Sequence, residues 1–327
     1  MILLTILALL LDLLYRLYRH FFPTPNISPN GKYIFISGCD TGFGHGLAIK
    51  LDKQGFNVLA GVFASDNVTS LREKLSSRAT VFRLDITKEE DIEAAFQLVK
   101  EKTNTLHALV NNAGISTSSF IDWMTIESMR EIMDVNFFGH VAITKKLLPL
   151  LIAKRDSRVV NVCSVAGILT VPMKSAYSAS KYALESFSDC LRREMFPWGL
   201  RVSIVEPGPM RTPIIEGHNE FMNKFWNHLS EDVQARWGED FLRVQAKNIS
   251  ENFLYRHAED PNKVVEVLEH AVLNSKPEIR YRPGWQSKYF FLPLSMAPVW
   301  LVDLIINRMT YSHVKPAGVR KQHLESN

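Results

Sequence analysis

Tyr177 and Lys181 are the pair of residues in this chain that most directly suggests acid–base chemistry. They stand four positions apart in a stretch with helical periodicity, so their side chains share one face of the predicted helix. An ammonium group beside a phenol favours the phenolate, which lowers the tyrosine pKa from about 10 toward neutral pH. A tyrosine poised in this way can take a proton from an alcohol, or give one to a carbonyl, during hydride transfer.

Two further polar residues could complete such a site. Ser164 follows a predicted strand, and its hydroxyl could bind the reacting oxygen. Asn136 lies in an apolar helical run, where an amide needs a buried partner or a chemical role. Each residue alone has an ordinary explanation, because Tyr-x-x-x-Lys pairs occur by chance, Ser164 could cap a turn and Asn136 could bond a backbone carbonyl. Their occurrence together, in this order, favours a catalytic site.

A glycine-rich turn follows the first predicted strand. It reads Ser37-Gly38-Cys39-Asp40-Thr41-Gly42-Phe43-Gly44-His45-Gly46 and leads directly into a helical pattern. Glycines at such a turn let backbone N–H groups approach a pyrophosphate at the helix N-terminus, because a Cβ would block that approach. The turn therefore predicts a dinucleotide site.

The charges around this turn favour NAD over NADP. A 2′-phosphate is usually bound by Arg or Lys near the loop or at the end of the second strand, and neither place has one. Asp40 in the loop would repel a phosphate. The acid that often binds the ribose hydroxyls at the tip of the second strand is missing at Val62 and Phe63, and Asp66 lies further along the chain.

The elements that must position these residues alternate between strands and helices. Apolar runs of strand length are Tyr33–Ser37, Asn57–Phe63, Thr80–Leu84, Ala108–Asn111, Arg158–Val162, Arg201–Glu206 and Glu278–Tyr281. Stretches of helical period are Gly44–Gln54, Lys88–Glu101, Ile126–Arg155, Ala176–Phe196 and Asn262–Asn274. Strands that are apolar on both faces and alternate with helices indicate a parallel sheet covered on both sides. We expect an α/β fold of the doubly wound Rossmann type.

Taken together, the motifs resemble those of the classical short-chain dehydrogenase/reductase family. The matches within residues 32–208 are Ser37-Gly38-x-x-x-Gly42-x-Gly44, Asn111-Asn112-Ala113-Gly114, Asn136, Ser164, Tyr177-x-x-x-Lys181 and Pro207-Gly208. The resemblance implies a catalytic tetrad of Asn136, Ser164, Tyr177 and Lys181. In that family the tyrosine is the acid/base and the serine polarises the substrate oxygen. The lysine lowers the tyrosine pKa and binds the nicotinamide ribose, and the asparagine holds a water of a proton relay.

The resemblance also implies the residues that contact the cofactor, NAD. Besides Tyr177 and Lys181 these are Gly38, Asp40, Gly42, Phe43, Gly44, Asp85, Ile86, Asn112, Ala113, Gly114, Pro207, Gly208 and Thr212. Asp85 and Ile86 would bracket the adenine, and Thr212 would contact the carboxamide. The resemblance further implies a homodimer formed through the two long helices 126–155 and 176–196.

A narrower set of motifs is similar to the branch that contains retinol and 17β-hydroxysteroid dehydrogenases. They are Gly38-Cys39-Asp40-Thr41-Gly42-Phe43-Gly44, Phe187-Ser188-Asp189, Leu191-Arg192-Arg193-Glu194, Val205-Glu206-Pro207-Gly208 and Arg280-Tyr281-Arg282-Pro283-Gly284. Members of this branch are typically microsomal, membrane-anchored and NAD-preferring, and they act on retinoids or hydroxysteroids. Mitochondrial 3-hydroxybutyrate dehydrogenases are relatives. The missing acid at the second strand fits this branch.

The chain outside the core motifs divides into further segments. We expect a membrane anchor at residues 1–22, a Pro/Asn/Ser linker at 23–31 and a dehydrogenase domain at 32–284, followed by a tail at 285–327. Residues 209–260 within the domain predict two or three extra helices that form a substrate lid. Their large apolar side chains are Phe221, Phe225, Trp226, Trp237 and Phe241.

The first 22 residues are far more apolar than the rest, yet Asp12 interrupts them. The uninterrupted run Ile2–Leu11 is too short to span a hydrocarbon core and lacks the features of a cleaved signal peptide. It could be a signal anchor with Asp12 near a boundary, a helix lying in the interface, or an amphipathic helix packed on the domain. In the spanning case, Arg16, Arg19 and His20 would hold the domain on the cytosolic side.

The apolar tail also permits three interpretations. Residues 285–311 are crowded with aromatic and aliphatic side chains, but Pro293, Pro298 and Asp303 argue against a clean membrane span. The segment could cover the core, form a pocket wall or contact a membrane a second time.

The composition narrows the possible partners and compartment. A net charge of +4 among 327 residues is too weak to imply a nucleic-acid partner, although it suits an anionic membrane surface. Cys39, Cys163 and Cys190 show neither metal-ligand spacing nor a disulfide framework, so the domain should face a reducing compartment. Cys163 and Cys190 resemble ordinary core residues. We expect no metal and an endoplasmic reticulum membrane location with a cytosolic domain. A lipid droplet or a mitochondrial membrane is the alternative.

These observations predict an NAD-dependent oxidoreductase that interconverts a bulky apolar alcohol, of retinol or hydroxysteroid type, and its aldehyde or ketone. One alternative is a dehydrogenase of a small hydroxy acid such as 3-hydroxybutyrate, which would need a cationic group near the nicotinamide to bind a carboxylate. The other is a non-catalytic dinucleotide-binding protein of a membrane or lipid droplet. Three Asn-x-Ser/Thr patterns, at Asn26, Asn67 and Asn248, would matter for a lumenal domain alone.

Overall fold

A parallel sheet of seven strands forms the centre of the protein, in the order β3-β2-β1-β4-β5-β6-β7. The computed structural model describes residues 11, 14, 17, 18, 21–214, 222, 225–310 and 312–325. The strands are β1 Tyr33–Ile36, β2 Asn57–Val62, β3 Thr80–Arg83, β4 Ala108–Asn111, β5 Arg158–Val162, β6 Arg201–Val205 and β7 Arg280–Tyr281. Each of the seven predicted strands is confirmed, with bounds that shift by at most two residues.

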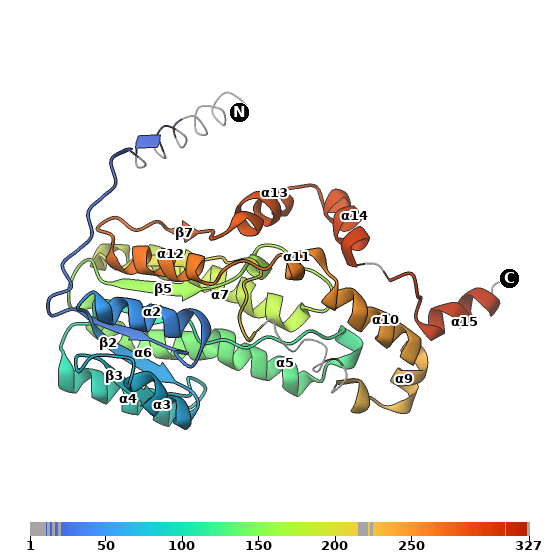
Figure 1. Ribbon diagram of the computed structural model, residues 1–327, viewed down its shortest axis with the longest axis horizontal. Coiled ribbons are helices and arrows are strands. Elements are labelled where there is room, and N and C mark those ends of the chain that lie inside the picture. Colours follow the sequence, from blue (N-terminus) through green and yellow to red (C-terminus); the bar gives the residue numbers. More distant parts are fainter. Residues whose placement is uncertain are drawn as a thin grey trace.

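Helices cover both faces of this sheet (Figure 1). The helices against the sheet are α2 Gly42–Lys53, α3 Ser65–Arg72, α4 Glu89–Lys102, α6 His140–Ile152, α7 Ser175–Glu194 and α12 Asn262–Leu273. An apolar core lies on each face of the sheet, and successive side chains of a strand point alternately into one core and the other. Ile34 and Ile36 of β1 pack with α2 and α12, whereas Phe35 packs with α4 and α6. The doubly wound fold is therefore confirmed, and its strand order reverses between β1 and β4, where such sheets bind ligands.

One long helical stretch is formed by α5 (Ile126–Met133), the π-helical turn η2 (Asp134–Gly139) and α6. Among the described residues this stretch alone is long and apolar enough to cross a membrane. Ile143, Leu147 and Leu151 within it are fully buried against the sheet. Core packing therefore accounts for its apolar character.

The predicted membrane segment falls largely outside the described residues, including Asp12 and the run before Leu11. The linker that follows it is tied to the domain. The Ile27 N–H donates to the Leu273 carbonyl at 2.9 Å, and the Ser275 N–H donates to the Pro25 carbonyl at 3.0 Å. The Asn274 amide also donates to the Thr24 carbonyl at 2.9 Å. The chain therefore enters the domain at a fixed point, the end of α12.

The insertion at 209–260 contains helices α9 (Glu231–Trp237), α10 (Glu239–Ser250) and α11 (Phe253–Arg256) within its described part, as predicted. Several of its aromatic side chains pack against the domain. Trp226, Trp237 and Phe241 pack on Phe120 and Trp123 of the domain, with the Trp123 and Trp226 ring centroids 5.3 Å apart. These contacts fasten the insertion to the domain, and the substrate lid stays a prediction. Phe221 lies outside the described residues.

The tail forms α13 (Leu292–Ser295), α14 (Val299–Thr310) and α15 (Ala317–Glu325) above and beside the insertion (Figure 1). It follows a charged cluster that closes the sheet. Arg280 of β7 bonds Glu206 at 2.9 Å and Asp189 at 3.0 Å and also contacts Glu185, and Arg282 bonds Glu206 at 2.7 Å. Buried carboxylates are tolerated because these guanidinium groups pair with them. The cluster ties β7 to α7.

The three cysteines form no disulfide. Cys39 and Cys163 are buried, as expected of small core residues, but Cys190 is exposed on the outer face of α7, so the prediction that it belongs to the core is wrong. Its position on α7 faces away from the sheet because Leu191, the next residue, takes the core-facing place.

Candidate active site

The backbone of the glycine turn packs so closely that two of its glycines have no space for a side chain. Gly38 has φ +69°, and a Cβ on it would lie 2.6 Å from the Ala113 Cα. A Cβ on Gly44 would lie 2.5 Å from the Gly38 carbonyl oxygen. Helix α2 begins at Gly42 without an acidic residue in its first turn, and the Thr41 side chain makes no capping hydrogen bond. The N–H groups at this helix start are thus free of a side-chain cap and suited to a phosphate.

Ser37 and Asn112 hold the turn against the end of β4. The Ser37 hydroxyl accepts hydrogen bonds from the N–H groups of Asn112 (3.1 Å) and Ala113 (3.2 Å). The Asn112 amide donates to the carbonyls of Ser37 (3.0 Å) and Gly38 (2.8 Å). This reciprocal clamp explains why a hydroxyl residue and an asparagine are both needed beside the glycines.

Asp40 reaches from the glycine turn to the tip of β2. Its carboxylate accepts hydrogen bonds from the N–H groups of Phe63 (2.8 Å) and Ala64 (2.9 Å) and from the Asn67 amide (2.8 Å). An acidic group therefore does stand at the end of the second strand, although it comes from another part of the chain. The sequence pattern alone gave no sign of this because the acid is distant from β2 along the chain.

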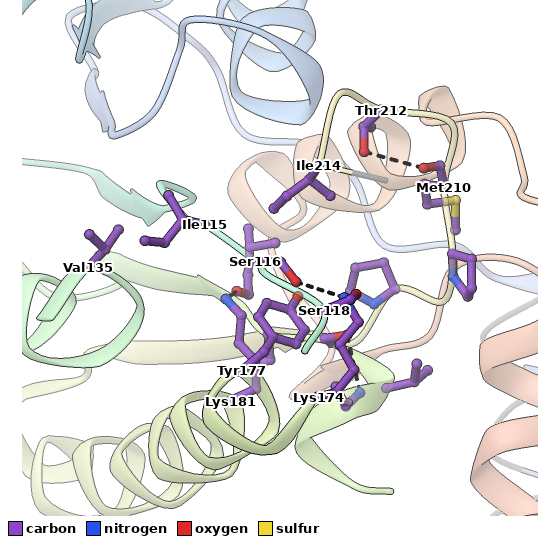
Figure 2. A pocket seen from close by; sticks show the side chains of 18 of the residues that line it. Ile115, Ser116, Ser118, Val135, Lys174, Tyr177, Lys181, Met210, Thr212 and Ile214 are labelled. Carbon is purple, nitrogen blue, oxygen red and sulfur yellow. Dashed lines mark hydrogen bonds between the residues drawn. The ribbon is translucent and has the colours of Figure 1, made fainter. Parts of the chain in front are cut away.

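Tyr177 and Lys181 point from the first turns of α7 into a common cavity (Figure 2). Ser164 follows β5, and its hydroxyl hydrogen-bonds the Tyr177 phenol while accepting from the Ala166 N–H at 3.1 Å. The Lys181 ammonium donates to the Val162 carbonyl at 2.9 Å and lies 5.7 Å from the centroid of the Tyr177 ring. The predicted serine, tyrosine and lysine are thus brought together.

The pKa of Tyr177 differs from the expectation. Burial raises it to about 12, and the hydrogen bond from Ser164 opposes this only in part. Burial also lowers the pKa of Lys181, whose ammonium is directed to a carbonyl and not to the phenol oxygen. In this arrangement desolvation of the phenol therefore outweighs the neighbouring cation.

Asn136 is fully buried in the π-helical turn η2, behind the cavity wall. Its amide oxygen accepts from the Ile115 N–H at 2.9 Å, and its amide nitrogen donates to the Ile115 carbonyl (2.9 Å) and the Ser180 hydroxyl (3.1 Å). The side chain thus joins the loop after β4 to α7. All of these side-chain bonds are to protein groups, so a water of the proposed relay would have to bind elsewhere at this turn.

Lys174 is a residue that the sequence analysis did not identify. It lies three positions before Tyr177, is 9% exposed, and donates to the Ser116 hydroxyl at 3.0 Å. Its ammonium lies 5.6 Å from the centroid of the Tyr177 ring, on the side opposite Lys181 (Figure 2). Burial lowers the pKa of Lys174 to about 8. Only its burial distinguishes it from a surface lysine, and burial is not visible in the sequence.

One cavity of about 950 Å³ joins the glycine turn to Tyr177. Its wall contains the predicted residues Gly38, Asp40, Gly42, Phe43, Asp85, Ile86, Asn112, Ala113, Gly114, Ser164, Tyr177, Lys181, Pro207, Gly208 and Thr212. Gly44 and Asn136 are not part of the wall. The insertion contributes Gln245, Asn248, Ile249, Asn252, Leu254 and Tyr255, and the tail contributes Phe291, Ile306, Met309 and Thr310. Among the described residues no cluster of acidic, His or Cys side chains could hold a metal ion.

The fold and the glycine cradle define a Rossmann-type protein whose residues fit a dinucleotide beside a tyrosine. A sequence model described as short chain dehydrogenase matches residues 32–223. The chain belongs to that family, whose fold binds a nicotinamide dinucleotide and whose members are alcohol oxidoreductases.

Two curated proteins and one solved structure are similar to this chain over most of its length. Retinol dehydrogenase 7 of Mus musculus is 40% identical over 290 residues, which cover 88% of this chain and 90% of that protein. The 17-beta-hydroxysteroid dehydrogenase type 6 of Bos taurus is 38% identical over 317 residues, or 95% and 98% of the two chains. The crystal structure of a short-chain dehydrogenase from Streptomyces avermitilis superposes with a TM-score of 0.67 at 25% identity, covering 85% of this chain and 96% of that one.

The cradle makes a prediction about dinucleotide binding. Gly38→Ala should weaken NADH binding at least about tenfold, because the new methyl group meets the Ala113 backbone and the turn must shift. Gly31→Ala is the matched control, since Gly31 has nearly the same φ (+67°) and no atom within 4 Å of its virtual Cβ. Fluorescence titration with NADH would measure both affinities. Equal affinities would show that crowding at Gly38 does not shape the site.

Proposed function

We propose that the protein is an NAD-dependent oxidoreductase that interconverts a bulky apolar alcohol, of retinol or hydroxysteroid type, and its carbonyl. The observation that carries this proposal is the cavity of about 950 Å³ in which the Tyr177 phenol, bonded to Ser164, lies next to the glycine turn. Part of this cavity would hold the dinucleotide, and the rest is lined by apolar side chains of the insertion and the tail, such as Leu254, Phe291 and Ile306, which suits a bulky apolar substrate. The names of the relatives agree with such substrates.

The proposed chemistry gives each residue a role. A bound nicotinamide dinucleotide would accept or supply the hydride. In oxidation, the alcohol carbon loses a hydride and the hydroxyl proton passes to Tyr177, and Ser164 holds the reacting oxygen. In reduction, the phenol gives its proton to the carbonyl oxygen. Burial raises the pKa of the phenol to about 12, which favours the protonated form that donates in reduction, whereas oxidation uses the phenolate.

NAD is supported by the position of Asp40. A carboxylate bonded to the Phe63 and Ala64 N–H groups lies where the adenosine ribose approaches the second strand in this fold. There it would accept hydrogen bonds from ribose hydroxyls and repel a 2′-phosphate. The segment from Phe63 to Asn67 contains no cation that could offset this charge.

A cytosolic domain is supported by two of the three Asn-x-Ser/Thr patterns. The Asn67 amide is used to bond Asp40, and Asn248 belongs to the cavity wall. A glycan on Asn67 would remove the hydrogen bond between its amide and Asp40. A glycan on Asn248 would occupy space in the cavity that the substrate or the dinucleotide needs. We therefore keep the proposed location on the endoplasmic reticulum membrane with a cytosolic domain. The homodimer through the long helices stays a prediction.

A second candidate function is favoured by Lys174. A buried ammonium close to Tyr177 is the cationic group that a carboxylate substrate such as 3-hydroxybutyrate would need. The mostly apolar wall argues for the bulky alcohol, whereas Lys174 and the Ser116 hydroxyl argue for an acidic group near the reacting carbon. A screen of retinoid, hydroxysteroid and hydroxy-acid substrates with NAD and NADP in detergent decides between them. Inactivity on all would support the non-catalytic alternative.

The role of Tyr177 can be tested directly. Tyr177→Phe should lower turnover at least about 100-fold, because the proton donor is removed, while dinucleotide affinity stays within about twofold. Tyr182→Phe, on the exposed side of the same helix, should leave both quantities unchanged. Steady-state kinetics and NADH titration provide the two readouts. Retained turnover in Tyr177→Phe would refute the mechanism.

The proposed preference for NAD has its own test. Asp40→Asn should lower the ratio of kcat/KM with NAD to kcat/KM with NADP by at least about tenfold, because the repelling charge is lost. Asp66→Asn is the control, because Asp66 is an exposed neighbour on α3. An unchanged ratio in Asp40→Asn would mean that another group selects the cofactor.

Lys174 predicts a dependence on pH. With a pKa of about 8, its ammonium loses its charge as the pH rises through that value, so KM for a hydroxy acid should rise above about pH 8. Lys174→Met should raise that KM at least about tenfold at neutral pH and abolish the alkaline rise, with little effect on retinol oxidation. Lys145→Met, an exposed lysine on α6, should do neither. A KM that is insensitive to Lys174→Met would exclude the carboxylate subsite.

A further inference from the structure

The connection between α13 and α14 presents an apolar surface that the domain does not cover. Met296, Val299 and Trp300 are 80%, 75% and 68% exposed. Tyr289, in the helical turn before α13, and Leu304, one turn after Trp300 in α14, are also exposed. We call these five side chains the hairpin face. Figure 1 shows α13 and α14 at the margin of the domain, and the side chains of the hairpin face are exposed to solvent there. Large apolar side chains exposed together mark an interaction site.

The opposite side of the same hairpin belongs to the cavity. Phe291, Ile306 and Met309 line it, and Phe291 and Ile306 are buried together with Leu294 in one apolar cluster. The hairpin is therefore a thin partition with the cavity on one side and the hairpin face on the other. A helix that served only to close the cavity would need apolar residues on its inner side alone.

The chemistry of the hairpin face indicates what it contacts. Trp300 and Tyr289 are the aromatic types that settle at the boundary between lipid headgroups and acyl chains. Lys288, whose ammonium lies 5.5 Å from the Tyr289 ring centroid, and the exposed Arg308 supply positive charge at its edges. The protein also carries a net charge of +4. These cations match an anionic lipid surface. Asp303, exposed on α14, restricts the contact to a shallow one.

A second group of exposed apolar side chains has a compatible position. Leu14, Tyr18 and Phe21 are exposed in the described part of the N-terminal segment, which leaves the domain on the same side as α13 and α14 in Figure 1. Two separate apolar groups on one side fit a planar surface better than a compact protein partner.

We propose that the hairpin face docks on the surface of a lipid bilayer and places the cavity wall at the headgroup boundary. The part of this proposal that concerns substrate entry from the lipid rests on the proposed function. The docking itself does not, because it depends only on the exposed side chains.

Tryptophan quenching by brominated lipid tests the docking on the full chain. The protein contains six tryptophans, and Trp300 in α14 and Trp198 in the turn before β6 are more exposed than Trp285, at 68% and 52% against 41%. The full chain would be reconstituted in phosphatidylcholine and phosphatidylserine vesicles with or without bromine on the acyl chains. Trp300→Phe should lower the bromolipid-dependent quenching at least about twofold, because the tryptophan nearest the acyl chains is lost. Trp198→Phe should leave it unchanged.

The controls separate the possible outcomes. Far-UV circular dichroism and NADH binding check that each variant is folded, and sedimentation with vesicles checks that each is membrane-bound. Equal quenching in wild type and Trp300→Phe would overturn the proposal. So would a Trp300 signal that changes with protein concentration and not with bromine, which would indicate a second copy of the chain on this face. If neither the wild type nor any variant turns over a substrate, that result counts against the proposed function. It does not change the conclusion from quenching, which depends only on membrane contact.

Discussion

The buried amide of Asn136 is the interaction on which the geometry of the candidate site depends. It bonds both backbone groups of Ile115 and the hydroxyl of Ser180, which in turn donates to the Tyr177 carbonyl at 2.7 Å. Three elements are thereby held in one arrangement: the loop after β4, the π-helical turn and α7. Leaving one buried amide group without a partner costs about 1–3 kcal/mol, so this arrangement is favoured over small rotations of α7.

Two further polar networks behind the site also fix the position of α7. On the sheet side, Asn111 donates to Thr144 at 2.9 Å and to Asn161 at 2.8 Å, and Asn161 donates to Ser188 of α7 at 2.7 Å. On the outer side, Arg280 joins α7 to the ends of β6 and β7. Buried polar networks of this kind specify one packing, because any slip leaves charged or polar groups unpaired. These networks give a structural role to Asn111, Ser188 and Arg280, which belong to the sequence motifs but take no part in the proposed chemistry.

Local patterns were sufficient to predict the sheet, the glycine turn and the order of the site residues. The strands are short apolar runs, and Tyr177 and Lys181 share a helical face, so neither required knowledge of distant contacts. Asp40 at β2 and the burial of Lys174 could not be found in this way, because both depend on which loops meet in space. The raised pKa of Tyr177 has the same origin, since the desolvating groups come from several elements. The packing of the insertion's aromatic residues on the domain could not be predicted either, because spacing does not reveal which face of a helix meets the domain.

The bonds between the linker and the end of α12 have a mechanical consequence. Thr24, Pro25 and Ile27 are all held by the segment from Leu273 to Ser275, so almost no slack chain separates the domain from the residues that precede it. An extended residue spans only about 3.5 Å. If those preceding residues are fixed in a bilayer, the domain can neither tumble freely nor drift away from it. The attachment then sets an orientation as well as a location, and the search for a ligand becomes diffusion in two dimensions.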